Sequence, residues 1–262
     1  MTQAAEVLLP SSPAEAAEAF GDGKGVTVIG GGTIVLPELT YGRLRPKKAI
    51  LLARAGLAGL TRSGSTVTIG GATPLTELVG LDSPVGPCAA NVADGELRGQ
   101  ATLGGNLCAG AGPEAPRGDL QGALLAVGAS VRSTGSGGES TLPIDEFLEG
   151  RGNRLVLAVS YEEPAAGAFV ALDRPHTHEY TALAVSAARL ADGSIRLAAT
   201  GAGGHGRRLP SAEAAAGDPA AAGEAALADV KPHDDALASA WYRQQTLPVL
   251  VRRALTMLEE AA

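Results

Sequence analysis

Two kinds of residue are scarce in this chain, the aromatics and the cysteines. Only 3% of the 262 residues are aromatic and only two are cysteine. Two cysteines in a chain of this length exclude a disulfide-stapled scaffold. Cys88 and Cys108 stand without any Cys-x-x-Cys pair, which argues against a zinc knuckle or a cysteine-ligated iron–sulfur cluster. We interpret both as small buried apolar side chains in a reducing compartment.

Runs of like charge and long apolar runs are missing as well. The 21 basic and 28 acidic residues give a net charge of −7, without a basic stripe that would attract nucleic acid. No apolar run approaches the roughly 18 residues of a membrane span, and residues 1–13 have neither the basic start nor the apolar stretch of a secretion signal. We therefore expect a cytoplasmic protein with no membrane span and no nucleic-acid partner.

Glycine and proline are plentiful, with 36 and 16 residues, and 45% of the chain is apolar. This apolar content can offset chain entropy and excludes a disordered chain, while the absence of a glycine period of three excludes a collagen. A compact, loop-rich globular protein remains. At roughly 100 to 200 residues per domain, the length fits one large domain or two modest ones, and we favour two.

The first part of the chain predicts alternating short helices and strands. Ser12 as N-cap, Pro13 and Glu15 indicate a helix that ends near Phe20. The β-branched run 26–29 indicates a strand that stops at a glycine cluster. Further strands are expected at 49–52, 66–69, 129–132 and 155–161, and helices at 74–79, 84–98 and 119–127.

The composition shifts at residues 162–164, and strands followed by helices are expected beyond this point. The strands are expected at 167–172, 183–190 and 195–200, and a helix–turn–helix at 212–228. Residues 234–260 predict a long helix with a break or kink near Thr246, because Pro248 costs about 3 kcal/mol in a helix interior. Its expected apolar stripe is Leu237, Trp241, Leu247, Leu250 and Leu258.

Two glycine clusters, Gly30–Thr33 and Thr102–Asn106, combine glycines with a threonine hydroxyl. Glycine lets backbone amides converge on an anion and removes side chains that would block its approach, so such loops can hold a pyrophosphate. Each cluster on its own is more often a simple tight turn. The two clusters together indicate a pyrophosphate site only if a known protein family uses both of them.

Such an arrangement exists, because the sequence resembles the FAD-binding medium subunit of the molybdenum hydroxylases, the xanthine dehydrogenase and carbon monoxide dehydrogenase family. That family carries two loops of the forms Ala/Gly-Gly-Gly-Thr and Thr-Ile-Gly-Gly-Asn. Residues 29–33 with Leu36-Pro37 match the first, and residues 97–107 match the second. The resemblance continues through 119–129 and 143–147, and segments between 233 and 255 look like the closing helix of the family's C-terminal domain.

The resemblance implies an α+β fold: an FAD-binding domain of the molybdopterin dehydrogenase (PCMH) type at 1–162, with subdomains at about 1–55 and 56–162, and a small C-terminal α+β domain at 163–262. It also implies FAD as the cofactor. The first loop would wrap the pyrophosphate, the second would hold its ribityl side, Asp119 would accept hydrogen bonds from the ribityl chain, and Val92 and Val156 would contact the flavin. The implied cofactor-binding residues are Ile29, Gly30, Gly31, Gly32, Thr33, Ile34, Val92, Thr102, Gly104, Gly105, Asn106, Asp119 and Val156.

The resemblance further implies the function. A large subunit with the molybdenum cofactor would reduce the 2Fe-2S clusters of an iron–sulfur small subunit. The present chain would then pass the electrons from that small subunit through FAD to NAD, oxygen or quinone. The expected assembly is a dimer of heterotrimers, and no residue of this chain is expected to act as a catalytic acid or base. The alternative is a stand-alone flavin- or nucleotide-binding module without electron-transfer partners.

Three departures from the family pattern are visible. Residues 109–117 form an apparent insertion of about four residues before Asp119, and the chain is short between Leu75 and Asn91. The family commonly has a lysine just after the phenylalanine of the first C-terminal strand. Here Phe169 is followed by Val170-Ala171-Leu172, so a flavin-side cation is missing unless Arg174 replaces it.

Other motifs carry less chemistry. Residues 201–206 satisfy Gly-x-Gly-x-x-Gly, but they are followed by Arg207-Arg208-Leu209-Pro210 and lie outside a βαβ unit, so a nicotinamide site is disfavoured. His176, His178 and Glu179 could ligate a metal, yet such residues in a proline-bounded loop are more often solvated. No Gly-x-Ser-x-Gly elbow supports hydrolase chemistry.

Overall fold

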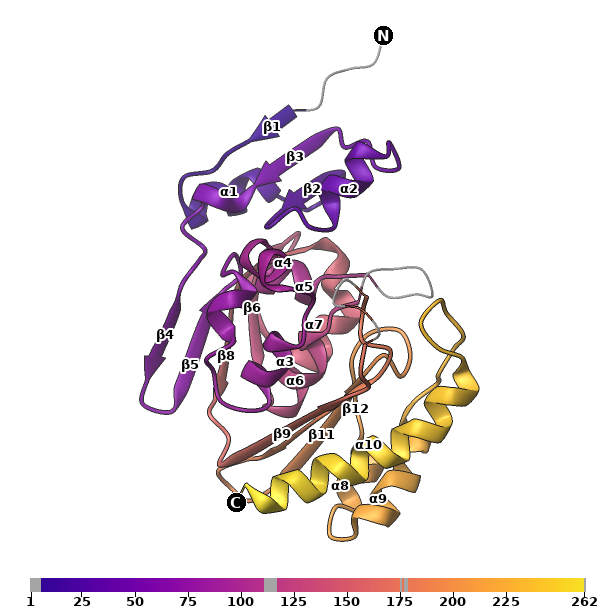
Figure 1. Cartoon of the computed structure of the whole chain (residues 1–262). Coiled ribbons are helices and arrows are strands. Elements are labelled where there is room, and N and C mark those ends of the chain that lie inside the picture. Colours follow the sequence, from indigo (N-terminus) through magenta and orange to yellow (C-terminus); the bar gives the residue numbers. More distant parts are fainter. Residues whose placement is uncertain (1–5, 111–116, 175, 177–178, 262) are drawn as a thin grey trace. The chain divides into compact units, whose positions relative to one another are not determined.

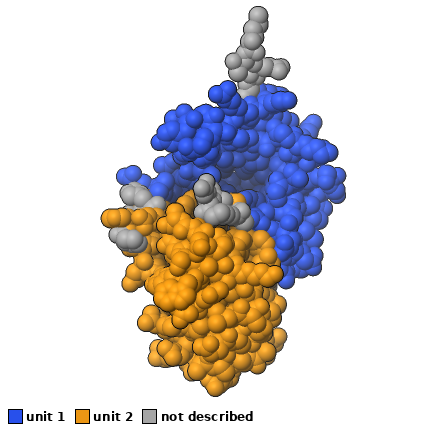
Figure 2. Space-filling view, turned by 90° about the vertical axis from the view of Figure 1, so that its right-hand side faces the viewer, with its two compact units in different colours: residues 1–77, 95–108, 130–160 blue, residues 78–94, 109–129, 161–262 orange. Residues whose placement is uncertain are grey.

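The structure is a computed structural model that describes residues 6–110, 117–174, 176 and 179–261. The chain divides into two compact units, coloured separately in Figure 2. The first unit comprises residues 1–77, 95–108 and 130–160, and the second comprises 78–94, 109–129 and 161–262. The chain leaves and re-enters each unit, so neither corresponds to one continuous stretch of sequence.

The first unit opens with a small parallel sheet of strand order β1-β3-β2 (Figure 1). Its elements are β1 (Glu6–Leu8), α1 (Pro13–Phe20), β2 (Val26–Ile29), α2 (Val35–Thr40) and β3 (Lys48–Leu51). The predicted start of α1 is confirmed, because the Ser12 hydroxyl accepts a hydrogen bond from the Glu15 N–H at 3.2 Å. The Glu15 carboxylate in turn accepts the N–H of Ser11 at 2.8 Å.

A second sheet of the first unit has the order β4-β5-β8-β6-β7. The pairs β4–β5, β6–β7 and β6–β8 are antiparallel. The strands are β4 (Leu60–Ser63), β5 (Thr66–Gly70), β6 (Ser130–Gly135), β7 (Gly138–Pro143) and β8 (Arg154–Glu162), and the helices of this unit that follow β5 are α4 (Gly95–Gln100), α5 (Leu103–Leu107) and α7 (Ile144–Gly150). Single 3-10 turns occur at Leu52–Arg54, Leu75–Leu78, Arg151–Asn153 and, in the second unit, Ala226–Asp229.

One apolar cluster joins the two sheets of the first unit. Phe20 of α1 and Ile50 of β3 are buried together with Leu155 and Leu157 of β8. Residues 155–159 of β8 are a continuous buried apolar run, and the side chains of Leu155 and Leu157, two residues apart, point to the same face of the second sheet. This shared core fixes the small parallel sheet, and with it the loop after β2, against the second sheet.

The second unit is built on an antiparallel sheet of order β12-β11-β10-β9. Its strands are β9 (Ala166–Ala171), β10 (Ala184–Arg189), β11 (Ile195–Thr200) and β12 (Arg207–Arg208), and its helices are α3 (Val85–Ala90), α6 (Leu120–Ala126), α8 (Pro210–Ala214), α9 (Pro219–Ala225) and α10 (Ala240–Glu260). The strands and the α6 helix that the sequence predicts here are therefore present, with boundaries that differ by one or two residues.

Helices cover both faces of this sheet (Figure 1). Leu197 and Ala199 of β11 belong to the apolar cluster that α10 completes. Successive strand residues point to opposite faces, and the next residue, Thr200, accepts a hydrogen bond from the Gly122 N–H of α6 at 3.1 Å through its hydroxyl. The sheet is thus packed between α10 and α6.

The single helix predicted at 84–98 is wrong. The chain forms α3 and α4 instead, separated by residues 91–94, where Ala93 takes a φ of 44°. A left-handed residue cannot continue a right-handed helix. The two helices also belong to different compact units, α3 to the second and α4 to the first.

The C-terminal helix differs from the prediction in two respects. It begins at Ala240, with Ser239 as N-cap, and it continues through Pro248 without a break. Packing of its buried face, which includes Leu247 and Leu250, outweighs the loss of one backbone hydrogen bond at the proline. Trp241 is 67% exposed and does not belong to the apolar stripe. None of the described helices is long and apolar enough to cross a membrane.

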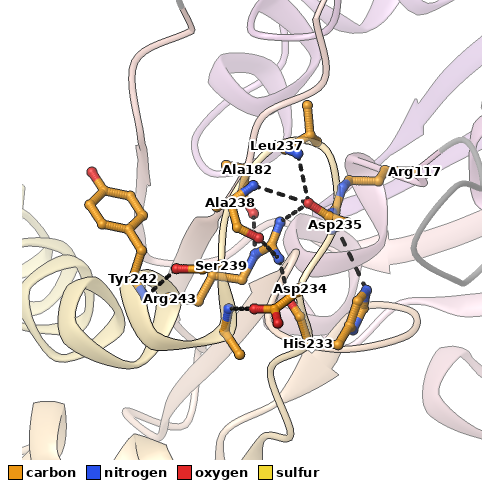
Figure 3. Close-up of polar contacts among 11 residues, drawn as sticks. Arg117, Ala182, His233, Asp234, Asp235, Leu237, Ala238, Ser239, Tyr242 and Arg243 are labelled. Atoms are coloured by element: carbon orange, nitrogen blue, oxygen red, sulfur yellow. Dashed lines mark hydrogen bonds and ion pairs between the residues drawn. The ribbon is translucent and has the colours of Figure 1, made fainter.

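A buried ion cluster ties the start of α10 to the rest of the second unit (Figure 3). The Asp235 carboxylate pairs with the guanidinium groups of both Arg117 and Arg243, and the Arg243 bond measures 2.8 Å. Arg243 is fully buried and also donates to the carbonyl oxygens of His233 and Ala238, at 2.6 and 2.8 Å. Burial, followed by the positive charge of Arg243, lowers the pKa of Arg117 to about 10, which still leaves Arg117 charged at neutral pH.

Asp235→Asn tests this cluster. The substitution keeps the shape of the side chain but leaves two buried guanidinium groups without their counter-charge, which should cost about 3 kcal/mol of unfolding free energy and lower the thermal midpoint by roughly 6–12 °C. Asp192→Asn at an exposed turn is the matched control and should leave the midpoint nearly unchanged. Equal midpoints for the two variants in a thermal unfolding scan would show that the cluster is not stabilising.

Candidate functional site

The first glycine cluster forms the loop between β2 and α2. Gly32 has a φ of 76°, in the left-handed region that favours glycine, and its carbonyl oxygen accepts the Leu36 N–H at 2.8 Å. Within the described part of the chain, the amide N–H groups of residues 30–34 have no protein acceptor. Several unpaired amides in one short loop are an arrangement that binds anions.

The second cluster is the start of a short helix rather than a simple tight turn. Thr102 is the N-cap of α5, and its hydroxyl accepts the Gly105 N–H at 3.3 Å. The Leu103 N–H donates to the Thr73 carbonyl oxygen at 3.0 Å, and the Gly104 N–H donates to that of Gly71 at 2.8 Å. These amides are thus bonded within the protein, in contrast to those of the first loop.

The two clusters touch each other in the first unit. A Cβ atom placed on Gly30 would lie 2.5 Å from the Thr102 hydroxyl oxygen, and one placed on Gly31 would overlap with the carbonyl oxygen of Gln100. No side chain fits between these backbone segments. The first loop therefore rests directly on the residues that lead into the second, although about 70 residues separate them in sequence.

Val156 of β8 lies beside the second cluster. A Cβ atom on Gly104 would lie 2.8 Å from the Gly71 carbonyl oxygen and 3.4 Å from Cβ of Val156. Gly104 is thus required by the packing of α5 against β8 and the segment after β5. The two loops and Val156, all predicted to bind the cofactor, therefore lie together in the first unit.

Gly105 differs from its neighbours. A Cβ atom there would meet the Thr102 hydroxyl oxygen at 3.1 Å and no other non-local atom within 4 Å. Protein packing alone therefore does not explain a glycine at this position. The Thr102 hydroxyl that limits this position is also the group that Gly30 of the first loop approaches.

Val92 and Asp119, the remaining predicted site residues, belong to the second unit. Val92 is buried just after α3, and Asp119 is buried at the start of α6. The main-chain oxygen of Asp119 accepts hydrogen bonds from the Cys88 thiol at 3.4 Å and from the Thr200 hydroxyl at 3.3 Å. These bonds fix the backbone of Asp119 between α3 and β11.

The cysteines are poor candidates for chemistry. Cys88 is buried and Cys108 is half-buried, and both thiols are free. Burial raises the pKa of Cys88 and raises that of Cys108 to about 12, so neither forms a reactive thiolate at neutral pH. Among the described residues no three metal-ligating side chains gather, and His178 lies outside those residues, as do residues 111–116 of the apparent insertion.

The glycine-rich segment 201–206 connects β11 to β12. The Gly206 N–H donates to the Gln121 side-chain oxygen at 2.8 Å, and a Cβ atom on Gly203 would lie 2.7 Å from the Lys231 carbonyl oxygen. The segment is followed by a strand and packs against its neighbours. It lacks the helix that a dinucleotide fingerprint requires.

The sequence reasoning missed Gly71 and Thr73, whose carbonyl oxygens accept the amides of the second cluster. The fully buried Thr73 hydroxyl donates to the Gly59 carbonyl oxygen at 3.0 Å and accepts the Gly59 N–H at 2.9 Å, which fixes the segment on which α5 rests. A signal was present, because Gly70-Gly71 also follows a β-branched strand, as Gly30-Gly31 does.

Comparisons with known proteins fit this geometry. A family model described as the FAD binding domain in molybdopterin dehydrogenase matches residues 3–161. The 6-hydroxypseudooxynicotine dehydrogenase complex subunit alpha of Paenarthrobacter nicotinovorans is 28% identical over 261 residues, covering 89% of this chain and 86% of that protein. The carbon monoxide dehydrogenase medium chain of Hydrogenophaga pseudoflava is 30% identical over 151 residues, covering 54% of this chain and 50% of that protein.

Solved structures share the fold over the whole chain. A chain of the Hydrogenophaga pseudoflava carbon monoxide dehydrogenase that lacks the Mo-pyranopterin moiety of its cofactor matches with a TM-score of 0.86 at 24% identity, over 100% of both chains. A chain of quinoline 2-oxidoreductase from Pseudomonas putida 86 matches with a TM-score of 0.82 at 19% identity, over 98% of both. The predicted α+β fold class is confirmed.

Two glycine-to-alanine variants separate packing glycines from ligand-facing ones. Gly31→Ala forces a Cβ atom into the Gln100 carbonyl group, so we expect a clear fall in thermal midpoint for the apoprotein. Gly105→Ala meets only the Thr102 hydroxyl oxygen at 3.1 Å and should shift the midpoint much less. Thermal unfolding without added ligand makes the comparison. A midpoint for Gly31→Ala at or above that of Gly105→Ala would contradict the loop contact.

Proposed function

This chain belongs to the family of FAD-binding domains of molybdopterin dehydrogenases, and from this premise we propose that it is the FAD-carrying electron-transfer subunit of a heteromeric molybdenum-containing hydroxylase or dehydrogenase. The two curated relatives are subunits of dehydrogenases, so the chain is an oxidoreductase subunit. The observation that carries the proposal is the direct contact between a loop of unpaired amides and a second, glycine-rich loop with one open side.

The first loop suits the pyrophosphate of FAD. Its unpaired amide N–H groups at residues 30–34 can donate hydrogen bonds to phosphate oxygens, and the glycines leave no side chain in the way. In this proposal Gly30, Gly31, Gly32, Thr33 and Ile34 bind the pyrophosphate, with Ile29 as the last strand residue before it.

The second loop would hold the cofactor by shape rather than by its amides. Gly104 and Gly105 let the chain approach closely, and Thr102 and Asn106 supply polar side chains. In the same proposal Val156 and Val92 make apolar contacts with the flavin, and Asp119 accepts hydrogen bonds from the ribityl hydroxyls. We further propose the domain division implied by the sequence, 1–162 and 163–262, which the family match over 3–161 supports.

Bound FAD would supply the redox chemistry, because its flavin can accept and release electrons. The residues of this chain would bind and orient the cofactor and limit its access to water. The proposed electron donor is an iron–sulfur small subunit with 2Fe-2S clusters, beside a large subunit with the molybdenum cofactor, in a cytoplasmic dimer of heterotrimers. The relatives support the subunit character, since one is part of a complex and the other is a medium chain.

The first experiment is a visible absorption spectrum of the purified chain, followed by release and identification of the chromophore. We expect FAD in the wild-type chain and loss of FAD from Gly105→Val, because its side chain would enter the open side of the second loop. Gly99→Val is the matched control, since a Cβ atom at Gly99 meets nothing within 4 Å, and it should retain FAD. Normal FAD content in a folded Gly105→Val chain would refute the loop assignment.

Co-purification tests the partners. When the chain is expressed with its genomic neighbours, we expect a complex that contains molybdenum and iron in addition to FAD. Metal analysis of the size-exclusion peak provides the measurement. A flavin-loaded chain that elutes alone in the presence of those neighbours would favour the stand-alone flavin module instead.

A further inference from the structure

The turn at residues 91–94 carries backbone strain. Ala93 has a φ of 44°, and it is the one residue other than glycine with a positive φ in the described part of the chain. This conformation is unfavourable for a residue with a Cβ atom, and it persists only where the surroundings hold it. The turn therefore needs an external support.

Arg174 provides such a support from another part of the second unit. Its Nη2 atom donates to the Ala93 carbonyl oxygen at 3.2 Å, and its Nη1 atom donates to the Glu179 carbonyl oxygen at 3.1 Å. The planar guanidinium presents its donors in a fixed geometry, so one side chain holds both segments in register.

The segment that follows is fixed as well. The Thr181 hydroxyl accepts a hydrogen bond from Nδ2 of Asn91 at 2.7 Å, and the neighbouring Ala182 carbonyl oxygen accepts one from Nε of Arg243 at 3.2 Å. Figure 3 shows Ala182 beside the buried cluster of Arg243 and Asp235. The turn is thus anchored at Asn91 and at Ala93, the two residues on either side of Val92.

We propose that Arg174 is a positioning residue of the flavin site, which holds Ala93 in its left-handed conformation and thereby fixes the place of Val92. This inference rests on the proposed function, in which Val92 contacts the flavin. It assigns Arg174 a structural bond to the main chain instead of the role of a flavin-side cation.

A double-mutant cycle tests the proposal in the full-length chain. Arg174→Ala removes the support, and Ala93→Gly removes the penalty of the left-handed conformation. We expect Arg174→Ala to weaken FAD binding about tenfold, equivalent to about 1.4 kcal/mol, and to alter the shape of the visible flavin bands. Adding Ala93→Gly should restore most of the affinity and the wild-type spectrum. Arg252→Ala, which removes an exposed arginine of α10, is the control and should change neither.

Two readouts keep this inference distinct from the proposed function. Coupling between positions 93 and 174 in the thermal midpoint of the apoprotein tests the support itself, and coupling in FAD affinity and spectrum tests its role at the flavin. Additive midpoints would overturn the support. Coupled midpoints with unchanged FAD affinity would overturn the positioning role. A wild-type chain that rejects FAD would overturn the proposed function and the positioning role together, while coupled midpoints would still show the support.

Discussion

The close approach of two backbone segments in the first unit is the constraint on which the candidate site depends. Gly31 lies so near the Gln100 carbonyl group that no side chain fits between them, and Gly30 faces the Thr102 hydroxyl in the same way. This contact converts two distant glycine clusters into one surface. The shared core of Phe20, Ile50 and the leucines of β8 keeps the small parallel sheet, and therefore the first loop, in this place. Without that core the loop would have no fixed partner for its unpaired amides.

The two loops contribute different chemistry, although their sequences look alike. The amides of residues 30–34 are left unpaired, whereas those of Leu103 and Gly104 bond to carbonyl oxygens of the segment after β5. Unpaired amides can donate hydrogen bonds to a bound anion, whereas amides that already donate to protein carbonyl oxygens cannot. The first loop is therefore the part of the surface suited to a charged group, and the second is suited to a group recognised by close contact. Gly105 marks where that contact remains open.

Much of the fold follows from local sequence signals. Ser12 and Pro13 predict the start of α1, and the β-branched run 26–29 predicts β2 and the loop after it, because capping and turn preferences act within a few residues. The predictions failed for two different reasons. The prediction of one helix over 84–98 passed over Asp94-Gly95, a dipeptide that marks turns, and Ala93 turns the chain there while Arg174 bonds to its carbonyl oxygen. Pro248 predicts a break that the packing of Leu247 and Leu250 suppresses.

The site shows the same division between local and distant causes. The glycine clusters could be found from their composition. The sequence could not show which glycines are required by packing and which leave space for a ligand, because that depends on the carbonyl groups of Gly71 and Gln100, which are far away in sequence. The buried pairing of Asp235 with Arg117 and Arg243 could not be predicted from local sequence either, since Asp235 is 118 residues from Arg117 and lies before the helix that carries Arg243. Because Arg243 also holds the Ala182 carbonyl oxygen, next to the Thr181 that anchors Asn91, this cluster and the strained turn belong to one connected set of bonds. The bonds that meet at residues 181 and 182 come from segments far apart in the chain, an arrangement that a sequence motif does not record.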